Sequence, residues 1–223
     1  HLIVLAPASV QEMADFVGLG FDLAYKYRNP VMMLADGVVG QMMERVKLPA
    51  PRPRRTDEEI ARECPWAVTG CPESRKPNIM TTLELVPQEM EKHNLHLQEK
   101  YRHIEEFEPR WEEHETEDAE YLIVAFGCVA RICQKAMEDA RAQGIKVGLL
   151  RPITLWPFPS EAIKRLSKRM KGILVVELNA GQMIEDVRLS LEEPRPVHHF
   201  GRMGGIVMDP DEVLVALKEK FEL

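Results

Sequence analysis

The chain has 223 residues, and its 29 Lys and Arg against 36 Asp and Glu give a formal net charge of −7. This length allows one or two domains, and 45% hydrophobic with 29% charged residues is typical of a soluble globular protein. The acidic balance argues against a nucleic-acid partner, because phosphate binding needs concentrated positive charge. Apolar runs are only a few residues long, whereas a membrane-spanning helix needs about 20. Four cysteines and no cationic, apolar leader indicate a cytoplasmic protein without a membrane partner.

Residues 1–49 predict one strand–helix–strand unit. An apolar strand at 2–5 is followed by Ser9 and Glu12, which have capping-box spacing and so mark a helix start. Apolar residues then recur at three- and four-residue steps until Asn29-Pro30, and a second strand follows at 31–34. A crossover of this length predicts parallel pairing. Two strands and one helix bury too little surface to stand alone, so we expect the end of a larger α/β domain and a chain that is a fragment.

Residues 50–117 predict an extended and helical linker. Prolines alternate with arginines around 49–55, a pattern typical of an extended surface segment. A short apolar island between Cys64 and Cys71 follows, and the roles of these two cysteines stay open. From Pro87 to about His114 the chain is polar and favours a helix. The acidic stretch 105–120 is interpreted as a solvated helix face or linker.

Residues 118–223 predict a second and nearly complete α/β pattern. Strands are expected at 121–126, 146–150, 173–178 and 197–200. Helices are expected at 129–143 and 160–170, and a third is expected after Asn179-Ala180-Gly181, ending near Leu191. The last helix is expected after Asp209 and Pro210, because these residues supply an N-cap and a first-turn proline. Residues 155–159 are expected to be a loop. Strands that alternate with helices predict a doubly wound parallel sheet.

The cysteines do not form a recognisable metal or cluster site. Cys64 and Cys71 are seven positions apart, Cys128 and Cys133 five, and neither spacing is that of a zinc or iron–sulfur motif. Cys133 falls inside a predicted helix and is interpreted as a small buried residue. Cys128 falls at the start of that helix, a position that lowers a thiol pKa. We therefore predict no metal site from these residues.

The histidines give weaker signals. His93 and His96 are three positions apart on a predicted helix and could share a face toward a metal, but no third ligand is evident, so exposed histidines are the favoured interpretation. His198 and His199 alternate across a short strand, so at most one of them faces a site.

Three strand-to-helix junctions remain as candidate binding positions. In parallel α/β sheets, ligands and partners meet the carboxyl ends of the strands, where helix N-termini offer unpaired N–H groups. On spacing alone, ordinary short turns are the favoured interpretation. The junctions are Asp36-Gly37 with Gln41, Gly127-Cys128, and the run Asn179-Ala180-Gly181-Gln182.

Several longer stretches together carry a family resemblance. They are Leu5–Met13, Lys26–Val31, Ala35–Glu44, Trp66–Gly70, Leu150–Pro159, Asn179–Met183 and Gly201–Gly205. In this order they resemble the α subunit of the 2-oxoacid:ferredoxin oxidoreductases. The branched-chain (2-oxoisovalerate) enzyme is the closest likeness, with the 2-oxoglutarate enzyme close behind. The run from Leu150 to Pro159 is the most specific of them.

The resemblance implies a thiamine-diphosphate enzyme that converts a 2-oxoacid to an acyl-CoA and CO2 while reducing ferredoxin. Residues 1–49 would be the end of a pyrimidine-binding domain, 50–117 the linker, and 118–223 a transketolase C-terminal-like domain. A β subunit would hold the diphosphate and its Mg²⁺, γ and δ subunits would carry iron–sulfur clusters, and the α subunit would form a dimer. No cofactor is expected on the fragment alone.

The resemblance assigns no catalytic residue, because no position here matches the glutamate that the family pairs with the aminopyrimidine ring. Asp36, Gly37 and Gln41 are the expected cofactor-binding residues. The expected interface residues are Asn179, Gly181, Gln182 and Arg202. The fragment alone is expected to be inactive.

Three alternatives stay open. The substrate could be 2-oxoglutarate or pyruvate, because pocket residues that reject or accept a charge are not evident. The chain could be a non-catalytic assembly module whose linker wraps a partner. It could also belong to a relative that uses NAD and a lipoyl carrier.

Overall fold

A computed structural model describes residues 1–68, 70 and 76–223. The chain divides into two compact units, one made of residues 1–48 with 100–223 and the other of residues 49–99. Thr69 and Cys71, which the sequence analysis singled out, lie outside the described residues. Within the described part, no helix combines the length and hydrophobicity that crossing a membrane requires.

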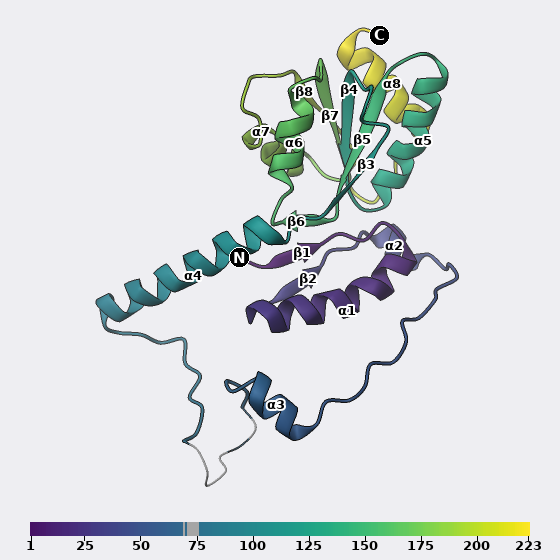
Figure 1. Cartoon of the computed structure of the whole chain (residues 1–223). Coiled ribbons are helices and arrows are strands. Elements are labelled where there is room, and N and C mark those ends of the chain that lie inside the picture. Colours follow the sequence, from purple (N-terminus) through teal and green to yellow (C-terminus); the bar gives the residue numbers. More distant parts are fainter. Residues whose placement is uncertain (69, 71–75) are drawn as a thin grey trace. The chain divides into compact units, whose positions relative to one another are not determined.

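The N-terminal block, residues 1–48, has the predicted strand–helix–strand order (Figure 1). Strand β1 (Ile3–Leu5) pairs in parallel with β2 (Val31–Met33) across helix α1 (Val10–Tyr27), and the short helix α2 (Gly37–Gln41) follows. Ser9 caps α1 as predicted by accepting the Glu12 N–H. The Glu12 carboxylate, however, accepts the Ala8 N–H at 2.7 Å. The expected reciprocal bond to Ser9 is therefore replaced by a contact one residue earlier.

The sheet of the N-terminal block has three strands where the sequence predicted two. Strand β6 (Thr154–Trp156) pairs antiparallel with β1, and the Ala6 N–H donates to the Ile153 carbonyl at 2.7 Å. The sequence prediction of a loop at 155–159 is thus wrong for its first residues. The strand was not predicted, because prolines follow it directly and its partner lies about 150 residues away in the sequence.

The other unit, residues 49–99, contains helix α3 (Asp57–Glu63) and most of helix α4 (Pro87–Phe107). A complete capping box begins α3: the Thr56 hydroxyl accepts the Glu59 N–H, while the Glu59 carboxylate accepts the Thr56 N–H. Cys64, which ends α3, is buried. Helix α4 ends at Phe107, earlier than predicted, because Trp111–His114 form strand β3. The interpretation of 105–120 as a helix face or linker is therefore wrong for these four residues.

The C-terminal domain, residues 111–223, is a doubly wound sheet with strand order β3-β5-β4-β7-β8. Strands β4 (Tyr121–Ala125), β5 (Val147–Pro152), β7 (Gly172–Glu177) and β8 (Val197–Gly201) are parallel, as predicted, and β3 adds an antiparallel edge. Edge strands of opposite direction are common on parallel sheets. Strand β3 was not predicted, because its residues Trp-Glu-Glu-His lie in an acidic, helix-prone context.

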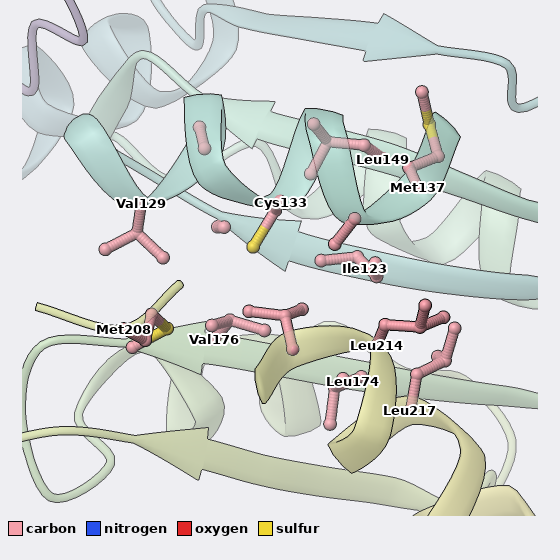
Figure 2. Packing of buried hydrophobic residues seen from close by; sticks show 14 of the residues in the cluster. Ile123, Val129, Cys133, Met137, Leu149, Leu174, Val176, Met208, Leu214 and Leu217 are labelled. Atoms are coloured by element: carbon pink, nitrogen blue, oxygen red, sulfur yellow. The ribbon is translucent and has the colours of Figure 1, made fainter. Parts of the chain in front are cut away.

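Helices cover both faces of this sheet (Figure 1). Helices α5 (Cys128–Ala142) and α8 (Pro210–Phe221) cover one face, and α6 (Ser160–Ser167) and α7 (Met183–Leu189) cover the other. Figure 2 shows side chains of α5, α8 and the strands directed into the hydrophobic core on the α5 and α8 face, among them Cys133, Leu174 and Leu214. Cys133 is completely buried there, which confirms its interpretation as a core residue. The Asp209 cap and Pro210 at the start of α8 are also as predicted.

Candidate functional site

The candidate site lies where the N-terminal block meets the carboxyl ends of β4 and β5. In the order β5-β4-β7-β8, the direction of the crossovers reverses between β4 and β7, so β4 borders the switch point at which doubly wound sheets bind ligands. Gly127 and Cys128 follow β4 at this point and begin helix α5. The N-terminal block supplies the groups that face them.

Asp36 links the N-termini of two helices. Its Oδ1 accepts the Val39 N–H at 2.9 Å and caps α2, while its Oδ2 accepts the Cys128 N–H at 2.9 Å at the start of α5. Burial raises the pKa of the Asp36 carboxyl, but the backbone hydrogen bonds from Cys128 and Val39 outweigh it, so the pKa lies below its ordinary value. A carboxylate on a helix N-terminus is stabilised by the helix dipole. Asp36 is therefore an ionised anchor between the two parts of the fold.

Gly127 makes room for this carboxylate. Its φ is +62°, and a Cβ at this position would lie 2.9 Å from Asp36 Oδ2. Any other L residue would meet both backbone strain and a clash here. The Gly127-Cys128 junction singled out in the sequence is thus a docking position for Asp36.

The expectation of a lowered thiol pKa at Cys128 is wrong. Burial and the hydrogen-bonded Asp36 carboxylate raise the pKa of the Cys128 thiol to about 12. The helix N-terminus does favour an anion, but Asp36 already supplies one. Cys128 therefore stays a protonated, buried thiol.

Glu12 and Arg151 form the second link between the N-terminal block and the C-terminal domain. Two guanidinium nitrogens of Arg151 donate to the two carboxylate oxygens of Glu12 at 2.8 and 2.7 Å. The Arg151 side chain is only 6% exposed, and Glu112 of β3 lies 3.2 Å from its Nε. Burial raises the pKa of the Glu12 carboxyl, but hydrogen bonds from Arg151 and Ala8 outweigh it and leave the pKa below its ordinary value. Arg151 was not singled out in the sequence, because nothing local marks it as the partner of Glu12.

Gly37 and Gln41, the other expected cofactor-binding residues, lie on α2 next to Asp36 and are exposed. The structure therefore brings the three residues together at the carboxyl end of β2. Both carboxylate oxygens of Asp36 accept backbone N–H groups, whereas Gly37 and Gln41 are exposed to solvent.

The expected interface residues gather at the carboxyl ends of β7 and β8. Asn179 Oδ1 accepts the N–H groups of Gly181 and Gln182, at 2.7 and 3.1 Å. Arg202 follows β8, donates its N–H to the Glu177 carbonyl and pairs through its guanidinium with Glu212. All four residues thus belong to one edge of the sheet.

Glu177 is the centre of this edge and was not singled out in the sequence. Its carboxylate is fully buried and accepts the N–H groups of Met183 and Ile184 at 2.8 and 3.1 Å, together with Asn179 Nδ2 at 3.0 Å. His199 Nε2 lies 3.8 Å from Glu177 Oε1. His198 instead packs against Phe221, so only one of the adjacent histidines faces this edge, as predicted. The glutamate ends a strand of apolar residues, which is the one signal that could have revealed it.

The part of the chain that the structure describes contains no group of three or more His, Cys, Asp and Glu side chains placed to hold a metal ion. His93 and His96 lie on α4 in the unit of residues 49–99, and both are exposed. Their exposure agrees with the interpretation of His93 and His96 as exposed histidines.

Two family descriptions match the chain. Residues 1–116 match "Pyruvate flavodoxin/ferredoxin oxidoreductase, thiamine diP-bdg", and residues 119–213 match "Pyruvate:ferredoxin oxidoreductase core domain II". Among solved structures, the 2-oxoglutarate:ferredoxin oxidoreductase from Magnetococcus marinus has the same fold, with a TM-score of 0.76 and 21% identity. That likeness covers 98% of this chain and 42% of that one.

Curated relatives are more similar in sequence. The ketoisovalerate oxidoreductase subunit VorB of Methanothermobacter marburgensis is 46% identical over 97% of this chain, and VorB of Methanothermobacter thermautotrophicus is also 46% identical. The 2-oxoglutarate synthase subunit KorA of Methanocaldococcus jannaschii is 30% identical over 96% of this chain. The chain spans 60 to 62% of the length of these relatives. Together these matches confirm the resemblance read from the sequence: the chain belongs to the pyruvate flavodoxin/ferredoxin oxidoreductase family, a family of 2-oxoacid oxidoreductase subunits.

Proposed function

We propose that the chain is part of a thiamine-diphosphate-dependent oxidoreductase that oxidatively decarboxylates 2-oxoisovalerate. The acyl group is transferred to coenzyme A to give a branched acyl-CoA, CO2 is released, and the two electrons pass to ferredoxin. The choice of this substrate is supported by the 46% identity to two ketoisovalerate oxidoreductase subunits, compared with 30% identity to a 2-oxoglutarate synthase subunit. 2-Oxoglutarate and pyruvate are the alternative substrates.

The proposed domain boundaries follow the family. Residues 1–49 form the end of a pyrimidine-binding domain, residues 50–117 a linker, and residues 118–223 the transketolase C-terminal-like domain. Asp36, Gly37 and Gln41 are the proposed cofactor-facing residues of this chain. The exposed pair, Gly37 and Gln41, offers the contact, and Asp36 holds the turn that presents them.

The described residues do not fit the diphosphate and Mg²⁺ of the cofactor. They contain no metal-binding cluster, and both oxygens of Asp36 already accept backbone N–H groups. We therefore assign that end of the cofactor to a β subunit, and the iron–sulfur clusters to γ and δ subunits. When bound, the cofactor supplies the cationic ring that accepts electrons as CO2 leaves.

Asn179, Gly181, Gln182 and Arg202 are proposed to line a subunit interface in the complex, which contains two copies of this chain. The Glu177 carboxylate holds the backbone of this edge by accepting N–H groups of residues 182–184. A rigid backbone lowers the entropy that binding a partner would otherwise cost.

The complete complex tests these assignments. Gln182→Ala and Arg202→Ala are expected to weaken subunit assembly, measured by size-exclusion chromatography, and to lower turnover. Lys171→Ala is the matched control, because Lys171 is an exposed cation beside the amino end of the same strand, β7. Wild-type assembly and turnover in both variants would remove the interface assignment.

Retention of thiamine diphosphate tests the reaction class. We expect the cofactor to remain with the complex when this chain is purified together with its partner subunits, as quantified in the denatured extract. Its absence would favour the alternative of a non-catalytic assembly module.

A further inference from the structure

One segment of the N-terminal block lies across the beginning of helix α5. This segment, residues 36–47, consists of the cap residue Asp36, helix α2 and the six residues that follow it without regular structure, and we name it the strap. Its first residue, Asp36, holds the Cys128 N–H, and Val39 packs into the core cluster that contains Cys128 and Val129. The strap therefore covers the exposed end of the C-terminal core.

The partly buried Val38 packs against the same cluster, and the other strap contacts lie at the molecular surface. Glu44 accepts a hydrogen bond from Arg131 of α5 at 2.9 Å and another from the Val10 N–H at 3.1 Å. Gln11 of α1 donates to the Lys47 carbonyl at 3.0 Å and accepts the Lys47 N–H at 2.8 Å. Surface ion pairs and hydrogen bonds of this kind stabilise only weakly.

The strap has the features of a segment that opens locally. Val39 is its single buried side chain, Met43 is 99% exposed, and α2 has only five residues. Isolated short helices are marginal in water, and segments with few buried contacts and exposed backbone open with a lower free energy than the domain that they cover. By contrast, β1 is paired on both sides, so the rest of the N-terminal block is held by sheet hydrogen bonds.

We infer that the strap is a releasable cover, which opens from the start of α5 while the C-terminal domain stays folded. When closed, it shields Cys128 and fixes α2 at the carboxyl end of β2. The inference goes beyond the proposed function, and its test measures no enzymatic activity.

Two cysteines on α5 report strap opening and domain unfolding separately. Cys128 is 5% exposed directly under the strap, whereas Cys133 is fully buried in the core (Figure 2). Alkylation of the 223-residue chain with iodoacetamide, followed by mass spectrometry of the peptides, gives a rate for each thiol. In the wild type we expect Cys128 to react faster than Cys133, because strap opening costs less than unfolding.

Two variants weaken the contacts that hold the strap closed and leave Cys128 itself unchanged. Gln11→Ala removes both hydrogen bonds to Lys47 without a change of charge and is expected to raise the Cys128 rate about fivefold. Val39→Ala shortens the buried side chain of the strap and is expected to raise the Cys128 rate about 20-fold. The Cys133 rate should stay unchanged in both. Asp139→Ala, which breaks an exposed ion pair on the same helix, is the control and should leave both rates unchanged.

Two results would overturn the inference. One is an unchanged Cys128 rate in both variants, which would mean that reagent reaches the thiol by another route. The other is a parallel rise at Cys128 and Cys133, which would mean that the strap opens only with the whole domain. If Val39→Ala fails to fold, Gln11→Ala still decides, because its change lies at the surface.

Discussion

At the residue scale, the fold depends on two carboxylates of the N-terminal block that accept hydrogen bonds from the C-terminal domain. Glu12 reaches a buried guanidinium, and Asp36 reaches a helix N-terminus. Glu12 was visible in the sequence as part of a capping box, and Asp36 as part of a strand-to-helix junction. Their long-range partners, Arg151 and Cys128, lie 139 and 92 positions away, and no local pattern encodes a contact at that separation.

Glu12→Gln is predicted to destabilise the chain by about 2–3 kcal/mol at neutral pH, because it leaves the buried Arg151 guanidinium without its bidentate partner. The folded-state pKa of Glu12 lies below its ordinary value of 4.5. Its contribution is therefore complete above 4.5 and is lost as pH falls through the lower, folded-state value. Urea denaturation at pH 7 should give a lower unfolding free energy for Glu12→Gln than for the wild type, and the two values should converge at acidic pH. A difference that persists unchanged in acid would contradict this assignment.

Gly127→Ala is predicted to destabilise by at least about 1–2 kcal/mol, because the position combines a φ of +62° with a Cβ 2.9 Å from Asp36. Gly40→Ala is the matched control, since Gly40 lies in a helix and its Cβ would meet nothing within 4 Å. Thermal unfolding should show a lower Tm for the first variant and an unchanged or slightly higher Tm for the second. Equal Tm values would refute the proposed fit of Asp36 against Gly127.

At the scale of elements, periodicity and capping chemistry predicted most helices and parallel strands. Ser9, Asp36 and Asp209 cap α1, α2 and α8 through local hydrogen bonds, which sequence spacing encodes directly. The two antiparallel strands were missed. Both β3 and β6 are short, and each exists because a distant strand offers it hydrogen bonds, so tertiary pairing overrides the local propensity.

Glu177 shows how an element can depend on one buried group. Because its carboxylate accepts the first N–H groups of α7, Glu177→Gln would turn an amide N–H2 toward donors and leave some of them unpaired. We expect a loss of about 3 kcal/mol in unfolding free energy, measured by urea denaturation. Glu185→Gln, an exposed change on the same helix, should cost far less than that. Similar losses in the two variants would argue against this role.

At the scale of the whole molecule, the docked N-terminal block places α2 against the start of α5, after strand β4, which borders the switch point of the C-terminal sheet. Family membership could be read from the sequence, because its motifs are long and occur in a fixed order. The substrate could not, because the choice between an isopropyl group and a carboxylate depends on pocket residues that neither the motifs nor the described contacts identify. The identity to the ketoisovalerate oxidoreductase subunits is what favours the branched-chain acid.

The most direct test of the proposed function compares kcat/KM of the complete complex for 2-oxoisovalerate, 2-oxoglutarate and pyruvate, with coenzyme A and ferredoxin present. An apolar pocket accepts the branched chain and rejects a second carboxylate through the desolvation cost of that charge. We predict that 2-oxoisovalerate is preferred by at least about tenfold. A clear preference for 2-oxoglutarate or pyruvate would contradict the substrate assignment, and no turnover of any of the three would contradict the proposed reaction itself.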